Sequence, residues 1–192
     1  MREFGTTIAH LGAERLQGID EVLVLGVGGL GHMGVQFIEA LSGADIIAVD
    51  TKQEALDLAV ACGAEYTVNS GDADAAAQIK EITKGRGCDV VLDFVGVDAT
   101  IALGIASSRI QGDMTVVGAA GGTYAYGLYT APYELCLRST YWGSRSELAE
   151  VLALAERGDI TVTYTKYSID EGLQVYKDLE AGKLKGRAVI VP

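Results

Sequence analysis

The strongest constraint on the fold of this chain is a glycine-rich string, Gly26–Gly31 (GVGGLG), which follows an apolar segment and precedes an amphipathic one. A strand, a tight turn and a helix in this order expose the free N–H groups of the first helical turn, where phosphate groups bind. In this interpretation Gly26 permits the turn, Gly28 lets a pyrophosphate approach the backbone, and Gly31 lets the helix pack closely on the strand. The string alone is a weak signal, because any tight strand-to-helix turn favours glycine.

The surrounding sequence alternates between strand-like and helix-like segments. Continuous apolar runs are typical of parallel strands that are covered on both faces. Right-handed crossovers between such strands favour one arrangement, a doubly wound α/β sheet of the Rossmann type with strand order 3-2-1-4-5-6. The expected strands are 21–25, 44–49, 65–68, 88–94, 114–118 and 137–142, with helices at 30–41, from Thr51 to just before Gly63, at 75–85 and at 100–107.

The last quarter of the chain has a different pattern. It predicts a helix around 148–155, a strand at 161–167, a helix at 168–182 and a strand at 188–191. Ser and Thr followed three residues later by Glu predict capping boxes, one formed by Thr51 with Glu54 and one by Ser168 with Glu171. We therefore divide the chain into a dinucleotide-binding domain with an N-terminal helix (1–143) and a C-terminal part (144–192).

An acidic residue at the end of the second predicted strand strengthens the cofactor interpretation. Asp50 lies 19 residues after Gly31, the separation expected of the residue that binds the adenosine ribose. Its carboxylate would accept hydrogen bonds from both ribose hydroxyls and would repel a 2′-phosphate. The sequence therefore predicts NAD rather than NADP; the simpler alternative is a solvated turn residue.

The ends of two later strands offer weaker candidates. Ligands of open α/β sheets lie beyond the carboxyl ends of the strands, which places Phe94–Gly96 and Val117–Gly118 near the cofactor. Turn glycines and core side chains would explain the same residues. No partner is visible in the sequence for His32 or His10, so we interpret His32 as a neutral histidine that lines the cleft.

Charge and cysteine content exclude several classes of function. The formal net charge is −11, whereas nucleic acids and anionic membranes require a basic surface. Cys62, Cys88 and Cys136 are far apart and odd in number, which favours reduced thiols over disulfides or a metal site. The start of the sequence has no signal-peptide pattern, and no apolar run is long enough to span a bilayer. We expect a soluble, cytoplasmic protein.

Several strings of this chain, taken in order, resemble the zinc-dependent medium-chain alcohol dehydrogenases. They are VLVLGVGGLGHMGVQF, IIAVD, VVLDFVG, TVVGAAGG, YWGSRSEL and AGKLKGRAVIVP. The sequence is most similar to bacterial NAD-dependent secondary-alcohol enzymes, and the similarity runs from about Gly5 to the C-terminus. It implies the cofactor-binding part of an enzyme that transfers hydride between a secondary alcohol or ketone and NAD.

The same resemblance implies that an N-terminal catalytic domain, with the first zinc ligands and the proton relay, belongs ahead of this segment. Glu3 stands roughly where the family has its third zinc ligand, but one carboxylate cannot form a zinc site that needs about three protein ligands. We therefore expect no metal and no catalytic residue in this chain, and no alcohol oxidation by it alone.

The resemblance also implies further cofactor contacts. Phe94 and Val95 match positions near the adenosine and nicotinamide riboses, and Val117 matches a residue behind the nicotinamide ring. The backbone at Tyr141 and Trp142 matches the segment that binds the carboxamide, and Arg187 matches an arginine that reaches the pyrophosphate. Lys52 is close to Asp50, but Ala55 occupies the usual place of the family's basic residue. The complete prediction for cofactor binding is Gly26, Gly28, Gly29, Leu30, Gly31, Asp50, Thr51, Phe94, Val95, Gly96, Val117, Gly118, Tyr141, Trp142 and Arg187.

Two alternatives stay open at this point. A non-catalytic NAD-sensing module would use the same glycine loop, and a methyltransferase would bind S-adenosylmethionine through a similar loop and an acidic strand end. The third glycine favours a dinucleotide over the second alternative. We also predict a dimer or larger species, because the sixth strand would be an unpaired sheet edge and apolar faces of the C-terminal part would be exposed.

Overall fold

The computed structural model describes residues 18–140 and 142–192. Strands and helices alternate over the first part, as the apolar runs predict. The elements are β1 (Glu21–Leu25), α2 (Gly31–Leu41), β2 (Asp45–Asp50), α3 (Gln53–Ala61), β3 (Tyr66–Asn69), α4 (Ala75–Ile82), β4 (Cys88–Asp93), α5 (Asp98–Ser107), β5 (Ser108–Val116) and β6 (Cys136–Ser139).

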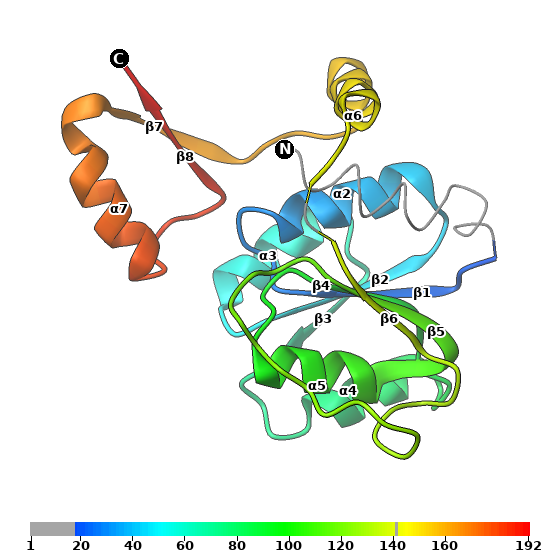
Figure 1. Ribbon diagram of the computed structural model, residues 1–192. Helices are drawn as coiled ribbons and strands as arrows, with labels where there is room; N and C mark the ends of the chain where they lie inside the picture. Colours follow the sequence, from blue (N-terminus) through cyan, green and yellow to red (C-terminus); the bar gives the residue numbers. More distant parts are fainter. Residues whose placement is uncertain (1–17, 141) are drawn as a thin grey trace.

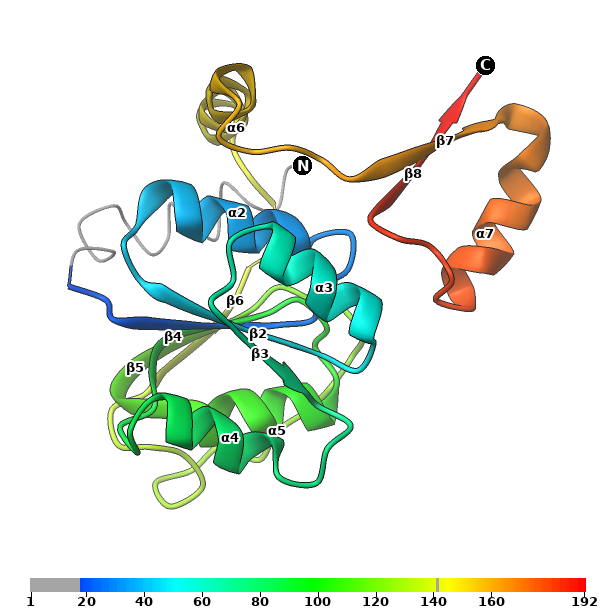
Figure 2. The same cartoon turned by 180° about the vertical axis from the view of Figure 1, so that it is seen from behind.

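The six strands form one parallel sheet in the order β3-β2-β1-β4-β5-β6. This confirms the doubly wound Rossmann topology. Helices α2 and α3 cover one face of the sheet, and α4 and α5 cover the other (Figure 1). Figure 2 shows the same two layers from behind. We call this part, residues 18–140, the sheet domain.

The core of the sheet domain has two halves because successive side chains of a strand point to opposite faces. Val22 and Val24 of β1 pack in the half that includes Val35 and Ile38 of α2. Leu23 and Leu25 pack in the other half with side chains of α4 and α5, such as Ile79, Ile101 and Ile105. A continuous apolar strand therefore supplies both halves of the core.

Several element boundaries differ from the sequence prediction, most of all the start of the fifth strand. The fifth strand begins at Ser108 rather than residue 114 and ends at Val116, and α5 leads into it directly. Ser108 pairs with Cys88, and the register then shifts so that Val90 pairs with Asp113, which leaves a bulge that no apolar periodicity marks. The sixth strand is shorter than predicted (Cys136–Ser139), and the seventh begins at Tyr164 rather than residue 161.

The rest of the chain consists of α6 (Arg145–Arg157), β7 (Tyr164–Ser168), the 3-10 helix η1 (Ile169–Glu171), α7 (Gly172–Glu180) and β8 (Arg187–Val191). Helix α6 packs on α2, where Val151 and Leu154 meet Met33 and Phe37. Strands β7 and β8 pair in parallel as a separate two-stranded sheet. We call β7–η1–α7–β8 the C-terminal unit; it stands to one side of the sheet domain (Figure 1).

One of the two predicted capping boxes is wrong. Helix α3 begins at Gln53 with Lys52 as its N-cap, and no side chain caps it. Thr51 lies one residue too early, and the Asp50 carboxylate accepts the Lys52 N–H instead. At Ser168 the Glu171 carboxylate does accept the backbone N–H, at 2.7 Å.

Within the described ranges, no helix has both the length and the apolar character that a membrane span requires. The predicted N-terminal helix, Glu3, His10 and Tyr141 lie outside the described residues.

Candidate cofactor-binding cleft

The glycine loop joins β1 to α2 at the carboxyl edge of the sheet. Gly26 has a φ of +84°, a conformation that favours glycine, and its N–H donates to the Val49 carbonyl at 2.8 Å. A Cβ on Gly31 would overlap the Gly26 carbonyl, so α2 can approach β1 only with glycine at this position. No atom lies within 4 Å of the place where a Cβ on Gly28 would stand. The loop is therefore tightly packed where Gly31 meets Gly26, and its backbone is accessible at Gly28.

The Asp50 carboxylate ends β2 beside this loop. One of its oxygens accepts the Val27 N–H at 2.8 Å, and the other accepts the Lys52 N–H at 3.1 Å. Each carboxylate oxygen has two lone pairs, so both can accept a further hydrogen bond from a ligand. Asp50 thus fixes the glycine loop and presents acceptors at its edge.

The carboxyl end of β4 is organised by a buried carboxylate that the sequence analysis missed. One oxygen of Asp93 accepts the N–H groups of Val95 and Gly96, both at 2.9 Å, and the other accepts the Thr100 hydroxyl at 2.8 Å. Asp93 is completely buried. An acidic residue inside an otherwise apolar strand is the sequence signal for such a role, because a buried charge needs partners.

The glycines at the ends of β4 and β5 touch each other. A Cβ on Gly96 would overlap the Gly118 carbonyl, and a Cβ on Gly118 would overlap the Val95 backbone. The N–H groups of Val117 and Gly118 donate to the Asp93 carbonyl at 2.8 and 3.0 Å. Close packing of two strand ends therefore explains Gly96 and Gly118, which is the simpler of the two interpretations that the sequence allows.

Arg187 reaches the glycine loop from the first residue of β8. A Cβ on Gly29 would lie 3.1 Å from Cδ of Arg187 and 3.1 Å from the Gly186 carbonyl. The Arg187 side chain therefore lies directly on the Gly29 backbone. Glycine at position 29 leaves the space for this contact.

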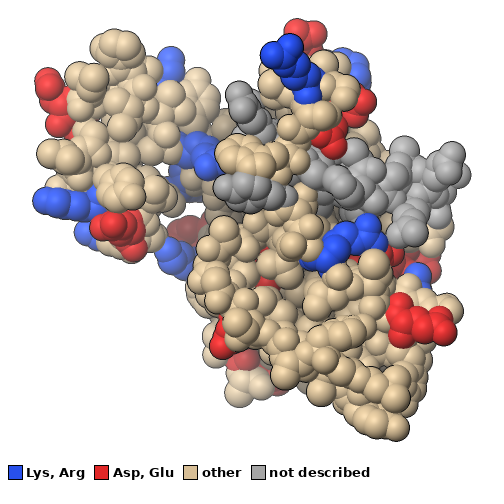
Figure 3. Space-filling view, in the orientation of Figure 1, with Lys and Arg blue, Asp and Glu red and all other residues tan. Residues whose placement is uncertain are grey.

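A cleft of about 1030 Å³ lies between the glycine loop and the C-terminal unit. Its wall on the sheet-domain side includes Gly28, Asp50 and Phe94, and its opposite wall includes Val175, Tyr176, Leu179 and Arg187. Figure 3 shows basic side chains along the side of the C-terminal unit that faces the sheet domain. A second hollow of about 470 Å³ lies at the ends of β1 and β2 and shares Gly26, Asp50 and Val95 with the first.

The structure brings most of the predicted cofactor residues to these two hollows. The large cleft is lined by Gly26, Gly28, Gly29, Leu30, Gly31, Asp50, Phe94, Val95 and Arg187, and the smaller hollow by Thr51 among others. Gly96, Val117, Gly118 and Trp142 line neither of them, and Trp142 is 57% exposed. The Phe94 ring lies against α2, where a Cβ on Gly34 would stand 2.6 Å from it.

Two further residues link the sheet domain to the C-terminal unit at the cleft. The Lys52 ammonium donates to the Gly182 carbonyl, and His32 is fully buried between the loop and Thr163. Burial lowers the pKa of His32; the hydrogen bond to the Gly28 carbonyl opposes this effect, and the charge of Arg187 adds to it. These surroundings favour the predicted neutral form of His32, but His32 does not line the cleft, so that part of the prediction is wrong. Its partner Thr163 lies 131 residues away, and no sequence motif marks it.

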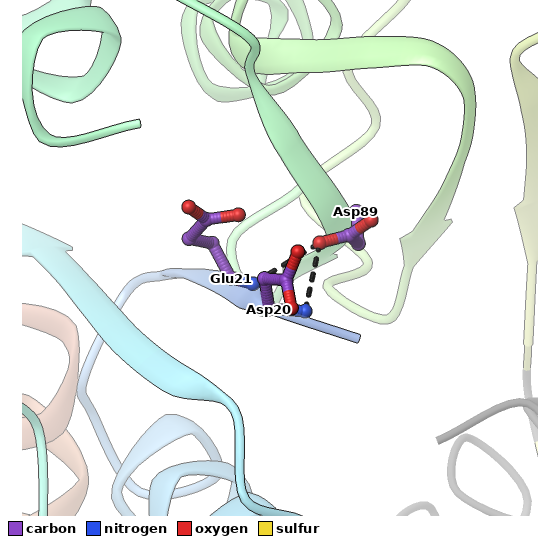
Figure 4. Close-up of side chains that lie close together, drawn as sticks. All are labelled: Asp20, Glu21 and Asp89. Carbon is purple, nitrogen blue, oxygen red and sulfur yellow. Dashed lines mark hydrogen bonds between the residues drawn. The ribbon is translucent and has the colours of Figure 1, made fainter. Parts of the chain in front are cut away.

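Metal-ligand geometry occurs elsewhere in the described part of the chain, in the group Asp20, Glu21 and Asp89 (Figure 4). These residues begin β1 and β4, at the edge of the sheet opposite the cleft. Asp89 already accepts the N–H groups of Asp20 and Glu21 and ion-pairs with Arg86 and Arg109, at 2.7 and 2.6 Å. Arginine already supplies the positive charge here, so the group does not fit a catalytic zinc.

Hydrogen bonds to Asp89 also decide its ionisation. Burial alone would raise its pKa, but the bonds from Arg86, the Glu21 N–H and Arg109 outweigh burial and hold the pKa of this carboxyl well below its usual range. The thiol of Cys88 at the same edge is the opposite case, because burial raises its pKa to about 12. Neither group lies at the cleft.

Comparison with known proteins agrees with the fold. The sequence profile of the zinc-binding dehydrogenase family matches residues 29–157, which is more than half of the chain. The chain therefore belongs to the zinc-binding dehydrogenase family. An NAD-dependent alcohol dehydrogenase from Sulfolobus acidocaldarius is 36% identical over 192 aligned positions, which include 93% of this chain and 53% of that protein.

Two further relatives show the same partial coverage. The NAD-dependent alcohol dehydrogenase of Sulfurisphaera tokodaii is 34% identical over 89% of this chain and 50% of its own length. The crystal structure of the alcohol dehydrogenase from Aeropyrum pernix superposes with a TM-score of 0.84 and 32% identity, over 98% of this chain and 57% of that one. The chain spans about half the length of the curated relatives it matches.

Proposed function

We propose that this chain is the NAD(H)-binding portion of a zinc-type, medium-chain alcohol dehydrogenase. The observation that carries the proposal is the large cleft, because three kinds of group that recognise a dinucleotide meet in it. They are the open backbone at Gly28, the carboxylate of Asp50 and the guanidinium of Arg187. The NAD-dependent alcohol dehydrogenases among the relatives support the same assignment.

Each of these groups suits one part of the cofactor. The N-terminus of α2 offers the positive end of the helix dipole to the pyrophosphate, while the N–H groups of His32, Met33 and Gly34 donate to the carbonyls of Gly28 and Leu30. Arg187 lies on Gly29 beside that turn and can donate two hydrogen bonds to phosphate oxygens. Asp50 has lone pairs left for the adenosine ribose hydroxyls, and its charge repels a 2′-phosphate, which favours NAD over NADP.

The proposal limits this stretch of chain to holding and orienting the cofactor. When bound, the nicotinamide supplies the site that exchanges a hydride with a secondary alcohol or ketone. Among residues 18–140 and 142–192, the only group with metal-ligand geometry lies at the opposite sheet edge and is neutralised by arginine. We therefore expect the purified chain to bind NADH and to oxidise no secondary alcohol by itself, even with added zinc.

The test is a fluorescence titration of the purified chain with NADH, NADPH and, as a third ligand, S-adenosylmethionine. We expect NADH to bind at least about tenfold more tightly than NADPH, because a 2′-phosphate would lie against the Asp50 carboxylate. The Asp50→Asn variant should reduce this preference, and Asp45→Asn, at the exposed start of the same strand, should not. Tighter binding of S-adenosylmethionine, or no binding of NADH, would contradict the proposal.

We extend the proposal to self-association and compartment. Among the described residues, strand β6 pairs only with β5, and Leu137 on β6 is partly exposed, so a second copy of the chain can add to this edge. Light scattering of the purified chain should give a dimer or larger species, and a clean monomer would contradict this.

Cys62, Cys88 and Cys136 are free thiols, as expected in the reducing cytoplasm.

A further inference from the structure

His32 joins the glycine loop, which lines the cofactor cleft, to the segment that leads into β7. It follows Gly31 in the first turn of α2 and is fully buried. Its Nδ1 lies 2.8 Å from the Gly28 carbonyl oxygen. On the other side of the ring, Nε2 accepts the Thr163 N–H at 3.3 Å. Both ring nitrogens thus contact main-chain groups, one in the glycine loop and one in the segment that leads into β7.

The chain of contacts continues from Thr163 back to the glycine loop. The Thr163 carbonyl accepts the Arg187 N–H at 2.8 Å. Gly186 packs so closely on Thr163 that a Cβ there would overlap the Thr163 carbonyl, and its φ is +66°. The Arg187 side chain then lies on Gly29, next to the residue whose carbonyl contacts His32. The contacts therefore form a closed circuit, from Gly28 through His32, Thr163 and Arg187 to Gly29.

The circuit requires one form of the imidazole. Nδ1 must carry the proton that is donated to the Gly28 carbonyl, and Nε2 must be free to accept from Thr163. A second proton on Nε2 would face the Thr163 N–H and break that bond. Burial and the nearby positive charge of Arg187 both lower the pKa of His32, so the neutral ring is favoured in this place.

We propose that His32 is a positioning residue for the cofactor, which holds Arg187 over the glycine loop by linking the loop to Thr163. The inference rests on the proposed function, since Arg187 is the group expected to contact the pyrophosphate. His32 itself does not line the cleft. Its effect on binding therefore passes through Arg187.

Gln36, one turn further along α2, provides a matched control. Its amide donates to the Thr161 carbonyl at 3.0 Å and accepts the Thr161 N–H at 2.7 Å. Gln36 therefore ties α2 to the same segment as His32, two residues earlier, without contact to the glycine loop. The same amide also donates to the His32 carbonyl at 3.1 Å, so Gln36→Ala loosens this segment while both hydrogen bonds of the His32 ring stay in place.

The first arm of the test measures NADH dissociation constants for the full 192-residue chain and four variants. We expect His32→Ala to weaken binding about tenfold, similar to Arg187→Ala, because loss of a charged hydrogen bond to phosphate has effects of this size. The double variant His32→Ala/Arg187→Ala should bind within about twofold of Arg187→Ala alone, because coupled residues are not additive. Gln36→Ala should change the affinity by less than about twofold.

The second arm uses two conservative variants that each keep one of the two bonds. In His32→Gln the amide oxygen can replace Nε2 and accept the Thr163 N–H, so we expect near wild-type affinity. In His32→Asn the amide nitrogen can replace Nδ1 and keep only the bond to Gly28, so we expect the weak binding of His32→Ala. If His32 only filled space, the NADH affinity of His32→Gln would not exceed that of His32→Asn in this way.

The third arm needs no cofactor. Amide hydrogen exchange at Thr163 and Arg187 should be faster in His32→Ala and His32→Asn than in wild type, and close to wild type in His32→Gln. If wild type fails to bind NADH, the proposed function fails together with the cofactor role of His32. If wild type binds NADH, three results would overturn only the role of His32. The first is that His32→Ala binds NADH as tightly as wild type. The others are that its loss of affinity adds fully to that of Arg187→Ala, or that Gln36→Ala loses as much affinity as His32→Ala.

Discussion

The sheet domain and the C-terminal unit both contain parallel strands joined through a helix, but their strands and helices are buried to very different degrees. All six residues of β4 are buried, whereas every residue of β7 and β8 is at least partly exposed. Helix α2 buries most of its length, whereas α7 exposes Leu173, Tyr176 and Leu179 and buries only Val175. Both regions have a parallel β-α-β arrangement, so the difference lies in what covers the strands.

The comparison shows that one region supplies its own core and the other does not. The sheet domain has helices on both faces, and its strands contribute to two separate clusters of buried side chains. The C-terminal unit has a single helix on a two-stranded sheet and is tied to the sheet domain mainly by hydrogen bonds from Gln36, His32 and Lys52. We expect changes in the sheet domain to alter global stability and equivalent changes in the C-terminal unit to have little effect.

The largest effect is expected at Asp89, the carboxylate that joins the starts of β1 and β4. Asp89→Ala should lower the free energy of unfolding by about 3–5 kcal/mol, because it removes a buried acceptor shared by Arg86, Arg109 and two main-chain N–H groups. The matched variant in the C-terminal unit is Asp178→Ala, whose exposed pair with Lys183 has a distance of 3.8 Å. Urea unfolding should give a change below about 0.5 kcal/mol for that variant, and equal effects would contradict the comparison.

A pair of leucines tests the comparison for apolar side chains. Leu23→Ala in β1, at 0% exposure, should lower the free energy of unfolding by about 2–5 kcal/mol through lost burial and a cavity. Leu173→Ala in α7, at 84% exposure, should change it by less than about 0.5 kcal/mol. The same urea titrations provide the measurement. A large effect of Leu173→Ala would show that another surface, such as a second copy of the chain, covers α7.

The smallest effect is expected on mild acidification. The pKa of Asp89 is lower in the folded state than in the unfolded state, so its ionised form stabilises the fold above the unfolded pKa of about 3.9 and this stabilisation is lost as the pH falls below that value. Between about pH 6 and pH 3, wild type should therefore lose more stability than Asp89→Asn. Identical pH profiles for wild type and Asp89→Asn would contradict this assignment.

Much of the fold could be predicted because local patterns and fold rules lead to the same answer. The six strands, their order and the covering helices follow from apolar runs and right-handed crossovers, and the structure confirms them. The errors occur where periodicity carries no information. The bulge that starts β5 at Ser108, and the N-cap of α3 at Lys52 rather than Thr51, depend on hydrogen bonds to neighbouring strands and to Asp50.

The residues of the candidate site also fall into those that the sequence predicted and those that it did not. Gly26, Gly28, Gly31 and Asp50 could be named from spacing, because a tight loop and a ribose-binding carboxylate need fixed positions along one β-α-β unit. Arg187 required the resemblance to a family, since it reaches the loop from the opposite end of the chain. The bridge from His32 to Thr163 could not be predicted from the sequence, since the two residues become neighbours only after folding. Asp93 was missed although its partners lie within seven residues of it, because spacing alone does not show which groups a carboxylate inside an apolar strand will bind.

By itself, the sequence determined the doubly wound sheet and the glycine loop, because each depends on residues that are close along the chain or on rules common to all such sheets. Only the tertiary structure decided which residues face the loop from the C-terminal unit and which carboxylates serve as structural anchors. Those contacts join positions as far as 131 residues apart, where no local periodicity or spacing can specify a partner.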